Sequence, residues 1–138
     1  MTERGCVFCA IVSGAPAHRV LEDATCVAFL DVRPLFPGHV LIVPRVHRDT
    51  IADITLEEGA ALFANAQRVA AAIEAALDAE GTFVAMNNRI SQSVPHAHLH
   101  VVPRRKGDGL RGFFWPRHKY ASDEEAATVA TKLRSALG

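Results

Sequence analysis

The feature that most constrains this chain is a run of three histidines at alternate positions, His96, His98 and His100, inside the stretch PHAHLHVVPRR. The residues between and after them favour β structure, so the pattern predicts a strand over 96–103. Side chains two apart on a strand share one face at a spacing of about 6.6 Å. The sequence therefore predicts a sheet with three imidazoles on one face and apolar residues on the other.

Four further strands are expected, because apolar, β-branched runs alternate with turn residues along the chain. Their predicted spans are 19–22 and 26–31, joined by a turn at 23–24, then 39–44 and 82–87. The run over 39–44 is apolar enough to be buried on both faces. Together with 96–103 they predict a mainly antiparallel five-stranded sheet.

Two helices complete an expected α+β fold. The capping-box sequence TLEE, with Thr55 at the N-cap and Glu58 three residues later, begins one long central helix, which Gly81 is expected to end. The sequence SDEE at 122–125 predicts the start of a C-terminal helix that continues to about Leu137.

Length and charge narrow the class of protein. A chain of 138 residues suits one domain, and its 15 basic and 15 acidic side chains cancel, which makes nucleic acid an unlikely partner. The N-terminal MTERGCVFCA lacks a basic head and a long apolar stretch, so we expect neither a signal peptide nor a membrane span. Three cysteines form no disulfide framework, so we expect a cytoplasmic protein with metal or redox use of the CxxC pair.

Three interpretations of the alternating histidines are open. Donor atoms on one tetrahedral zinc lie only about 3.3 Å apart, which disfavours one ion shared by all three rings. A middle imidazole that attacks phosphorus, while its neighbours set its tautomer or bind developing negative charge, suits the row better. Chance alternation explains one histidine more readily than three in register.

The segment HAHLHVV resembles the signature of the histidine-triad (HIT) family of nucleotide-binding proteins and hydrolases. CVFCAIVSG, VAFLDVRPLFPGHVLIVPRVH and NN…SQSVPH are similar to other segments of that family, specifically of a bacterial Hint-like branch with an N-terminal CxxC. The resemblance implies a HIT-like fold in a single domain over 1–138, with a core over about 6–105 and an extension with a helix over 106–138. It also implies a homodimer that binds a purine nucleotide such as AMP.

What the resemblance implies about activity centres on His98, the expected nucleophile toward a nucleoside α-phosphate. The nucleotidyl-histidine intermediate would release a nucleoside monophosphate, and the substrate would be a nucleoside phosphoramidate or a dinucleoside polyphosphate. The catalytic residues would be His98, His100, His39 and Ser93. The nucleotide-binding residues would be Asp31, Val32, Asn87, Gln92, Ser93, His98, His100, Phe8, Ile11 and Phe29.

Each of these assignments has a structural alternative. Asp31 and Ser93 also suit turns, and the apolar members of the set also suit a core. The approach to the triad, NNRISQSVPH, carries Arg89 and no glycine where many HIT proteins have several, so we expect a shorter, stiffer loop.

Cys6 and Cys9 supply two thiolates, and a structural zinc needs two more ligands. The residues alone leave Cys26, His18, His39, His47 and a triad histidine as candidates, and free thiols or a redox pair as alternatives. The resemblance implies a structural Zn²⁺ held by Cys6, Cys9, His47 and His96, with no catalytic metal. His18 and His118 are interpreted as ordinary surface or loop residues.

Residues 104–119 are basic and aromatic, with Phe113, Phe114 and Trp115 among the cations. Such a segment could hold a phosphate-rich leaving group, contact nucleic acid, or pack the last helix against the core or a partner subunit. Two rival functions therefore accompany the nucleotide hydrolase. They are hydrolysis of adenylylated nucleic-acid ends, and a nucleotide- or zinc-binding module with vestigial activity.

Overall fold

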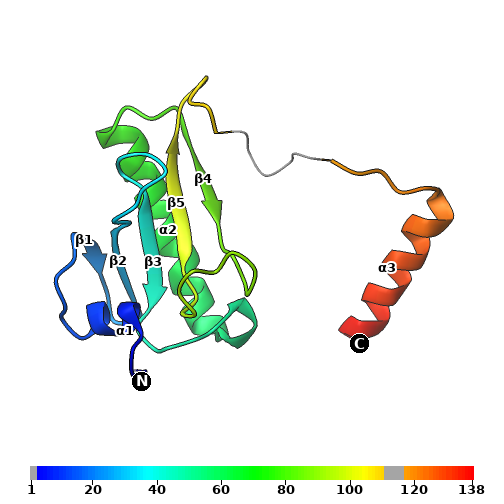
Figure 1. The fold of residues 1–138 in the computed structure, drawn as a ribbon, viewed down its shortest axis with the longest axis horizontal. Coiled ribbons are helices and arrows are strands. Elements are labelled where there is room, and N and C mark those ends of the chain that lie inside the picture. Colours follow the sequence, from blue (N-terminus) through cyan, green and yellow to red (C-terminus); the bar gives the residue numbers. More distant parts are fainter. Residues whose placement is uncertain (1–2, 111–116) are drawn as a thin grey trace. The chain divides into compact units, whose positions relative to one another are not determined.

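A computed structural model describes residues 3–110 and 117–138. Its sheet has the order β1-β2-β3-β5-β4, and every neighbouring pair is antiparallel. The strands are β1 (Arg19–Glu22), β2 (Cys26–Leu30), β3 (Val40–Pro44), β4 (Gly81–Ala85) and β5 (Leu99–Arg104). The helices are α1 (Val7–Val12), the short 3-10 helix η1 (Ile51–Asp53), α2 (Leu56–Ala76) and α3 (Asp123–Leu137). The predicted α+β fold is confirmed (Figure 1).

The chain divides into two compact units, residues 1–108 and 109–138. The first contains the whole sheet, α1 and α2. The second contains α3, whose N-cap Ser122 accepts a hydrogen bond from the Glu125 backbone N–H, as the sequence predicts. None of the helices in the described residues is long and apolar enough to cross a membrane.

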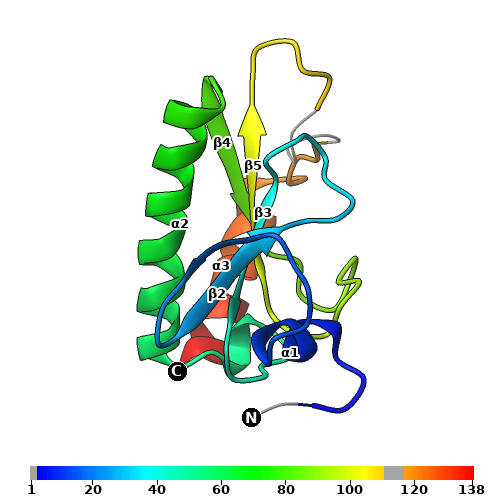
Figure 2. The same cartoon turned by 90° about the vertical axis from the view of Figure 1, so that its left-hand side faces the viewer.

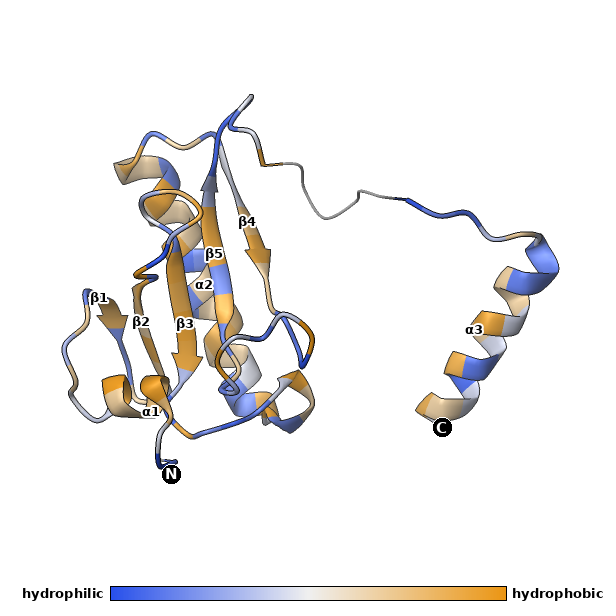
Figure 3. Ribbon diagram, in the orientation of Figure 1, coloured by the Kyte–Doolittle hydropathy of each residue, from blue (hydrophilic) through white to orange (hydrophobic). Residues whose placement is uncertain are grey.

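The sheet separates two buried layers because successive side chains of a strand point to opposite faces. One layer packs against α2 and contains Cys26, Ala28, Val40, Ile42, Leu62, Ala66, Val69, Ile73 and Val101. The other contains Phe8, Val27, Phe29, Leu41 and Val43. Helix α2 runs along one face and α1 lies beside the other (Figure 2). The central strands are accordingly apolar, and β3 is buried on both faces as predicted (Figure 3).

The predicted start of the long helix is confirmed, and its predicted end is wrong. The Thr55 hydroxyl accepts from the Glu58 N–H at 3.1 Å, and the Glu58 carboxylate accepts from the Thr55 N–H at 2.9 Å, which is a capping box. The helix stops at Ala76, and Asp78 then adopts a left-handed backbone with φ of 55°. Gly81 begins β4 instead of ending the helix.

Two local features differ from the sequence prediction. Helix α1 was not expected, since six residues are too few to show helical periodicity. Strand β5 begins at Leu99 rather than at His96. The Ala97 N–H donates to the Arg48 carbonyl at 2.6 Å, so the backbone at this position bonds to the loop after β3 and not to a neighbouring strand.

Candidate active site

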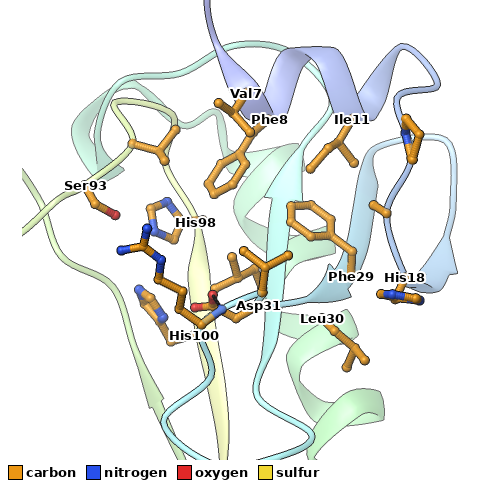
Figure 4. A pocket seen from close by; sticks show the side chains of 16 residues that line it. Val7, Phe8, Ile11, His18, Phe29, Leu30, Asp31, Ser93, His98 and His100 are labelled. Carbon is orange, nitrogen blue, oxygen red and sulfur yellow. Dashed lines mark hydrogen bonds between the residues drawn. The ribbon is translucent and has the colours of Figure 1, made fainter.

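A cavity of about 450 Å³ opens on the face of the sheet that carries α1. Predicted site residues that line it are Phe8, Ile11, Phe29, Asp31, Val32, Ser93, His98 and His100. In Figure 4 the apolar side chains gather on one side, Ser93 and the two histidines on the other, and Asp31 lies between them. The pocket therefore combines an apolar wall with a polar wall, which is typical of sites that bind small molecules.

The apolar wall is also part of the core. Phe8 and Phe29 meet edge to face with centroids 5.4 Å apart, and both are buried. Val32, by contrast, is 88% exposed and stands at the rim. The two phenylalanines thus serve packing and pocket together, because the slot is the open edge of the buried layer on this face.

His98 has its tautomer set by the backbone. Its Nδ1 lies 2.7 Å from the carbonyl oxygen of His96, and a carbonyl only accepts, so Nδ1 carries the hydrogen. The lone pair is therefore on Nε2. Burial lowers the pKa of His98 below its ordinary value, which keeps the ring neutral near pH 7. A neutral imidazole with an unprotonated Nε2 is the nucleophilic form.

A chain of hydrogen bonds sets the tautomer of His100 in the opposite sense. The Leu35 N–H donates to His39 Nδ1 at 3.1 Å, so His39 carries its hydrogen on Nε2. That Nε2 lies 2.9 Å from His100 Nδ1 and donates to it. His100 therefore keeps a hydrogen on Nε2, available for donation. The centroids of the His98 and His100 rings lie 4.9 Å apart. The ring with an unprotonated Nε2 therefore lies next to the ring that carries an Nε2–H donor.

The pKa shifts of these rings agree with neutral tautomers. Burial lowers the pKa of His39, and the nearby His98 lowers it further while Asp31 opposes the shift. Burial, with repulsion from His98 and His39, lowers the pKa of His100 to about 4. The polar wall thus offers hydrogen bonds near pH 7 rather than positive charge.

Asp31 follows β2 directly and is held by its own turn. Its Oδ1 accepts from the Arg33 backbone N–H at 2.9 Å, an Asx turn. Its Oδ2 lies 3.7 Å from His39 Nε2, too far for a hydrogen bond. Among the described residues no donor lies within hydrogen-bond distance of Oδ2, so this oxygen can accept from a hydroxyl at the pocket.

The loop between β4 and β5 places Ser93 on the pocket, but among the described residues the lining includes neither Asn87 nor Gln92. The Gln92 side-chain amide donates to the Asp49 carbonyl at 2.6 Å, and its oxygen accepts from the Arg89 N–H at 2.8 Å. Gln92 therefore supports the loop from within. Arg89 and Ser91 have φ of 71° and 60°, so this glycine-free loop still takes the left-handed turns that glycine adopts without strain.

A second cluster lies where α1 meets the residues before β5. One donor atom from each of Cys6, Cys9, His47 and His96 lies within 4.8 Å of the others. Cys9 Sγ lies 3.3 Å from His47 Nδ1 and 3.5 Å from His96 Nδ1, and Cys6 Sγ lies 3.4 Å from His96 Nδ1. These separations are close to those between the ligands of a tetrahedral zinc ion.

Both cluster histidines present Nδ1 because a hydrogen-bond acceptor holds Nε2. His96 Nε2 lies 2.8 Å from the Pro44 carbonyl, and His47 Nε2 lies 2.8 Å from Asp49 Oδ1 and 3.0 Å from Glu3 Oε2. Such acceptors orient a metal-binding imidazole. Asp31, His39 and His100 also lie within 4.8 Å of one another, and the hydrogen bond from His39 to His100 accounts for the closeness of those two rings.

The HIT domain family model matches residues 13–107. The chain belongs to the HIT family. This HIT protein is 33% identical over 135 residues to an adenosine 5'-monophosphoramidase of Schizosaccharomyces pombe, covering 96% of this chain and 98% of that one. It is 31% identical over 143 residues to an adenylylsulfatase of Arabidopsis thaliana, covering 98% and 71%.

A solved structure from Mycobacterium smegmatis, a zinc-bound histidine triad family protein, is 41% identical to this HIT protein. Its TM-score is 0.74, over 96% of this chain and 97% of that one. That protein binds zinc. In this one, two thiols and two imidazoles with oriented Nδ1 atoms make a donor set that fits Zn²⁺.

Sequence reasoning missed part of the pocket of this HIT protein. Arg33 and His18 line it, although the sequence indicates only a surface or loop residue at His18 and gives no prediction for a pocket role of Arg33. Arg33 stands two residues after Asp31, the carboxylate expected to bind the ribose. This proximity in the sequence was the signal that could have indicated a role for Arg33 at the pocket. The approach of His18 comes from the folding of the α1–β1 connection over the sheet and has no local signature.

The basic, aromatic segment is only partly described. Phe113, Phe114 and Trp115 lie outside the described residues. Arg104 donates to Asp108 at 2.6 Å and 3.1 Å, and Arg105 donates to the carbonyls of Leu77 and Asp78. These two cations thus stabilise the end of β5, which is a structural role.

Proposed function

We propose that this HIT protein hydrolyses nucleotides at the α-phosphorus, through an intermediate in which the nucleotide is bonded to His98. The observation that carries the proposal is the pairing of a bare Nε2 on His98 with an N–H on His100, at one wall of a pocket with an apolar slot. A purine base can pack against the apolar slot that Phe8, Ile11 and Phe29 line, and the carboxylate of Asp31 can accept from the ribose hydroxyls.

In the first step, His98 Nε2 donates its lone pair to the α-phosphorus. The bond from phosphorus to the leaving group breaks, and its electron pair departs with that group; a phosphoramidate nitrogen also takes up a proton from solvent. His100 Nε2–H and the Ser93 hydroxyl donate to the phosphate oxygens as charge develops on them. His39 holds His100 in the donating tautomer and is therefore a positioning residue.

In the second step, water bonds to phosphorus and the bond from phosphorus to Nε2 breaks. The nucleoside monophosphate leaves, a proton passes to solvent, and His98 recovers its lone pair. Asn87, exposed after β4, is a further proposed phosphate or ribose contact, and Gln92 acts through the loop that carries Ser93.

The test is release of AMP from adenosine 5'-phosphoramidate, followed by chromatography. His98→Ala should abolish release while circular dichroism stays native. His118→Ala removes an exposed imidazole that is not among the described lining residues, and should leave kcat within about threefold of the unaltered protein. Equal release by His98→Ala and the unaltered protein would refute the mechanism.

A structural Zn²⁺ at Cys6, Cys9, His47 and His96 is part of the proposal. Bound there, it would fasten α1 to the residues before β5 and take no part in the steps at phosphorus. Metal analysis should find about one zinc per chain, lost in Cys6→Ser and retained in Cys26→Ser, since Cys26 lies on the α2 side of the sheet. Stoichiometric zinc in Cys6→Ser would contradict this ligand set.

We also propose a homodimer of single HIT domains, each formed by the whole chain with its C-terminal extension, acting in the cytoplasm. Light scattering after size-exclusion chromatography measures the molar mass and so tests the homodimer directly. A monomer at micromolar concentration would contradict it.

A further inference from the structure

The charges around the pocket are unbalanced for a substrate with several negative groups. Apart from histidines, the charged residues among the described lining of the pocket are Asp31 and Arg33. Asp31 is negative and suits neutral ribose hydroxyls. The Nε2 of His98 is the unprotonated nucleophile and the Nε2–H of His100 is a neutral hydrogen-bond donor, so neither imidazole of the polar wall is a permanent cation. Among the described lining residues, Arg33 is thus the permanent cation.

The backbone of Arg33 is fixed while its guanidinium remains available. Its N–H donates to Asp31 Oδ1 at 2.9 Å, and Pro34 follows it, so the residue is anchored at the rim. Other arginines of this protein are committed to carboxylates, such as Arg48 to Glu58 at 2.9 Å. No described carboxylate forms an ion pair with the Arg33 guanidinium, and the side chain is exposed to solvent.

A guanidinium recognises phosphate or sulfate through two parallel hydrogen bonds. A neutral amine leaving group offers no such partner. With the base in the apolar slot, the ribose at Asp31 and the α-phosphate at His98, the remaining part of the substrate is the leaving group. Arg33, the permanent cation among the described lining residues, is suited to an anion on that part.

We propose that Arg33 determines substrate specificity by binding an anionic leaving group, a sulfate or phosphate joined to the α-phosphate. This inference rests on the proposed function, since it assigns the leaving-group end of the same pocket. The protein then prefers adenylyl anhydrides to phosphoramidates of neutral amines. Hydrolysis of the anhydride yields AMP and the free sulfate or phosphate.

The experiment compares kcat/KM for adenosine 5'-phosphosulfate and adenosine 5'-phosphoramidate. Arg33→Gln should lower the value for the phosphosulfate by about 10- to 100-fold and that for the phosphoramidate by less than about threefold. Arg33→Lys should recover part of the loss, because it restores charge without the fork. Arg68→Gln makes the same change on α2, on the other face of the sheet, and should leave kcat/KM unchanged for both substrates.

A binding measurement separates the two proposals. In the His98→Ala background, Arg33→Gln should weaken binding of adenosine 5'-phosphosulfate by about tenfold more than binding of adenosine 5'-phosphoramidate. If the unaltered protein turns over neither substrate, the proposed function fails, and this difference still tests Arg33. An equal loss for both ligands, or no loss, in both kinetics and binding would overturn the role of Arg33.

Discussion

Acid should destabilise this protein through His100, and the size of the effect follows from its surroundings. The ring is largely buried, its Nδ1 accepts from His39 at 2.9 Å, and its pKa is lowered to about 4. Protonation would set two N–H groups against each other. The unfolded chain takes up the same proton near pH 6.5, so below that value the unfolded state binds more protons. The stability present above about pH 6.5 is therefore lost as pH falls toward 4.

At pH 5 this linkage amounts to about 2 kcal/mol if the whole shift is realised. His100 retains some contact with solvent, which reduces the expected loss to about 1–2 kcal/mol. Urea unfolding at pH 7 and pH 5 gives the loss of free energy of unfolding for each protein, and the contribution of His100 is the difference between the losses of the unaltered protein and of His100→Asn. The unaltered protein should lose about 1–2 kcal/mol more free energy of unfolding than His100→Asn over this interval.

The comparison cancels acid effects that both proteins share, including protonation of a metal site. His118→Asn, a change at an exposed histidine near α3, is the matched control and should follow the unaltered protein. If His100→Asn loses as much stability as the unaltered protein, the ring is not held neutral by the fold, and the tautomer chain from Leu35 to His100 is wrong.

Three further predictions concern the surroundings of the site. Gly38 has φ of 98°, and a Cβ there would meet the Leu77 side chain, so Gly38→Ala should lower the free energy of unfolding by about 1–3 kcal/mol in urea titrations; an unchanged midpoint would contradict the strain. Arg89→Gly should raise it by up to about 1 kcal/mol, because glycine relieves the left-handed φ of 71°, and a loss of stability would show that the Arg89 side chain matters more than its backbone. Asp49→Ala removes an acceptor 2.8 Å from His47 Nε2 and should weaken zinc binding by about tenfold in chelator competition, against an unchanged affinity if His47 is not a ligand.

Much of the fold could be predicted because its signals are local. The capping residues of α2 and α3, the apolar strands and the turn between β1 and β2 depend on neighbours within a few residues. The misplaced start of β5 has the opposite cause. The backbone N–H of Ala97 is hydrogen-bonded to the carbonyl of Arg48, which lies far away in the sequence. The β propensity of a residue contains no information about such a distant partner.

Of the site, the sequence could supply the residue types and, through the family resemblance, a set of positions. The functions of those positions stay predictions for the experiments above. Which of them share a pocket was decided by tertiary structure. Asp31 and His98 come together because β2 and β5 flank β3, whereas Gln92 bonds to Asp49 and lies outside the described lining.

By itself, the sequence determined that this chain forms an α+β domain with imidazoles clustered beside one strand. The reason is that hydrophobic periodicity and helix capping depend on residues that are neighbours in the sequence. Only the tertiary structure decided that His96 faces two thiols while His98 and His100 face the pocket, and which nitrogen of each ring carries hydrogen. A tautomer depends on the acceptor or donor opposite it. Those partners, the carbonyls of Pro44 and His96 and the N–H of Leu35, are set by backbone geometry and not by residue type.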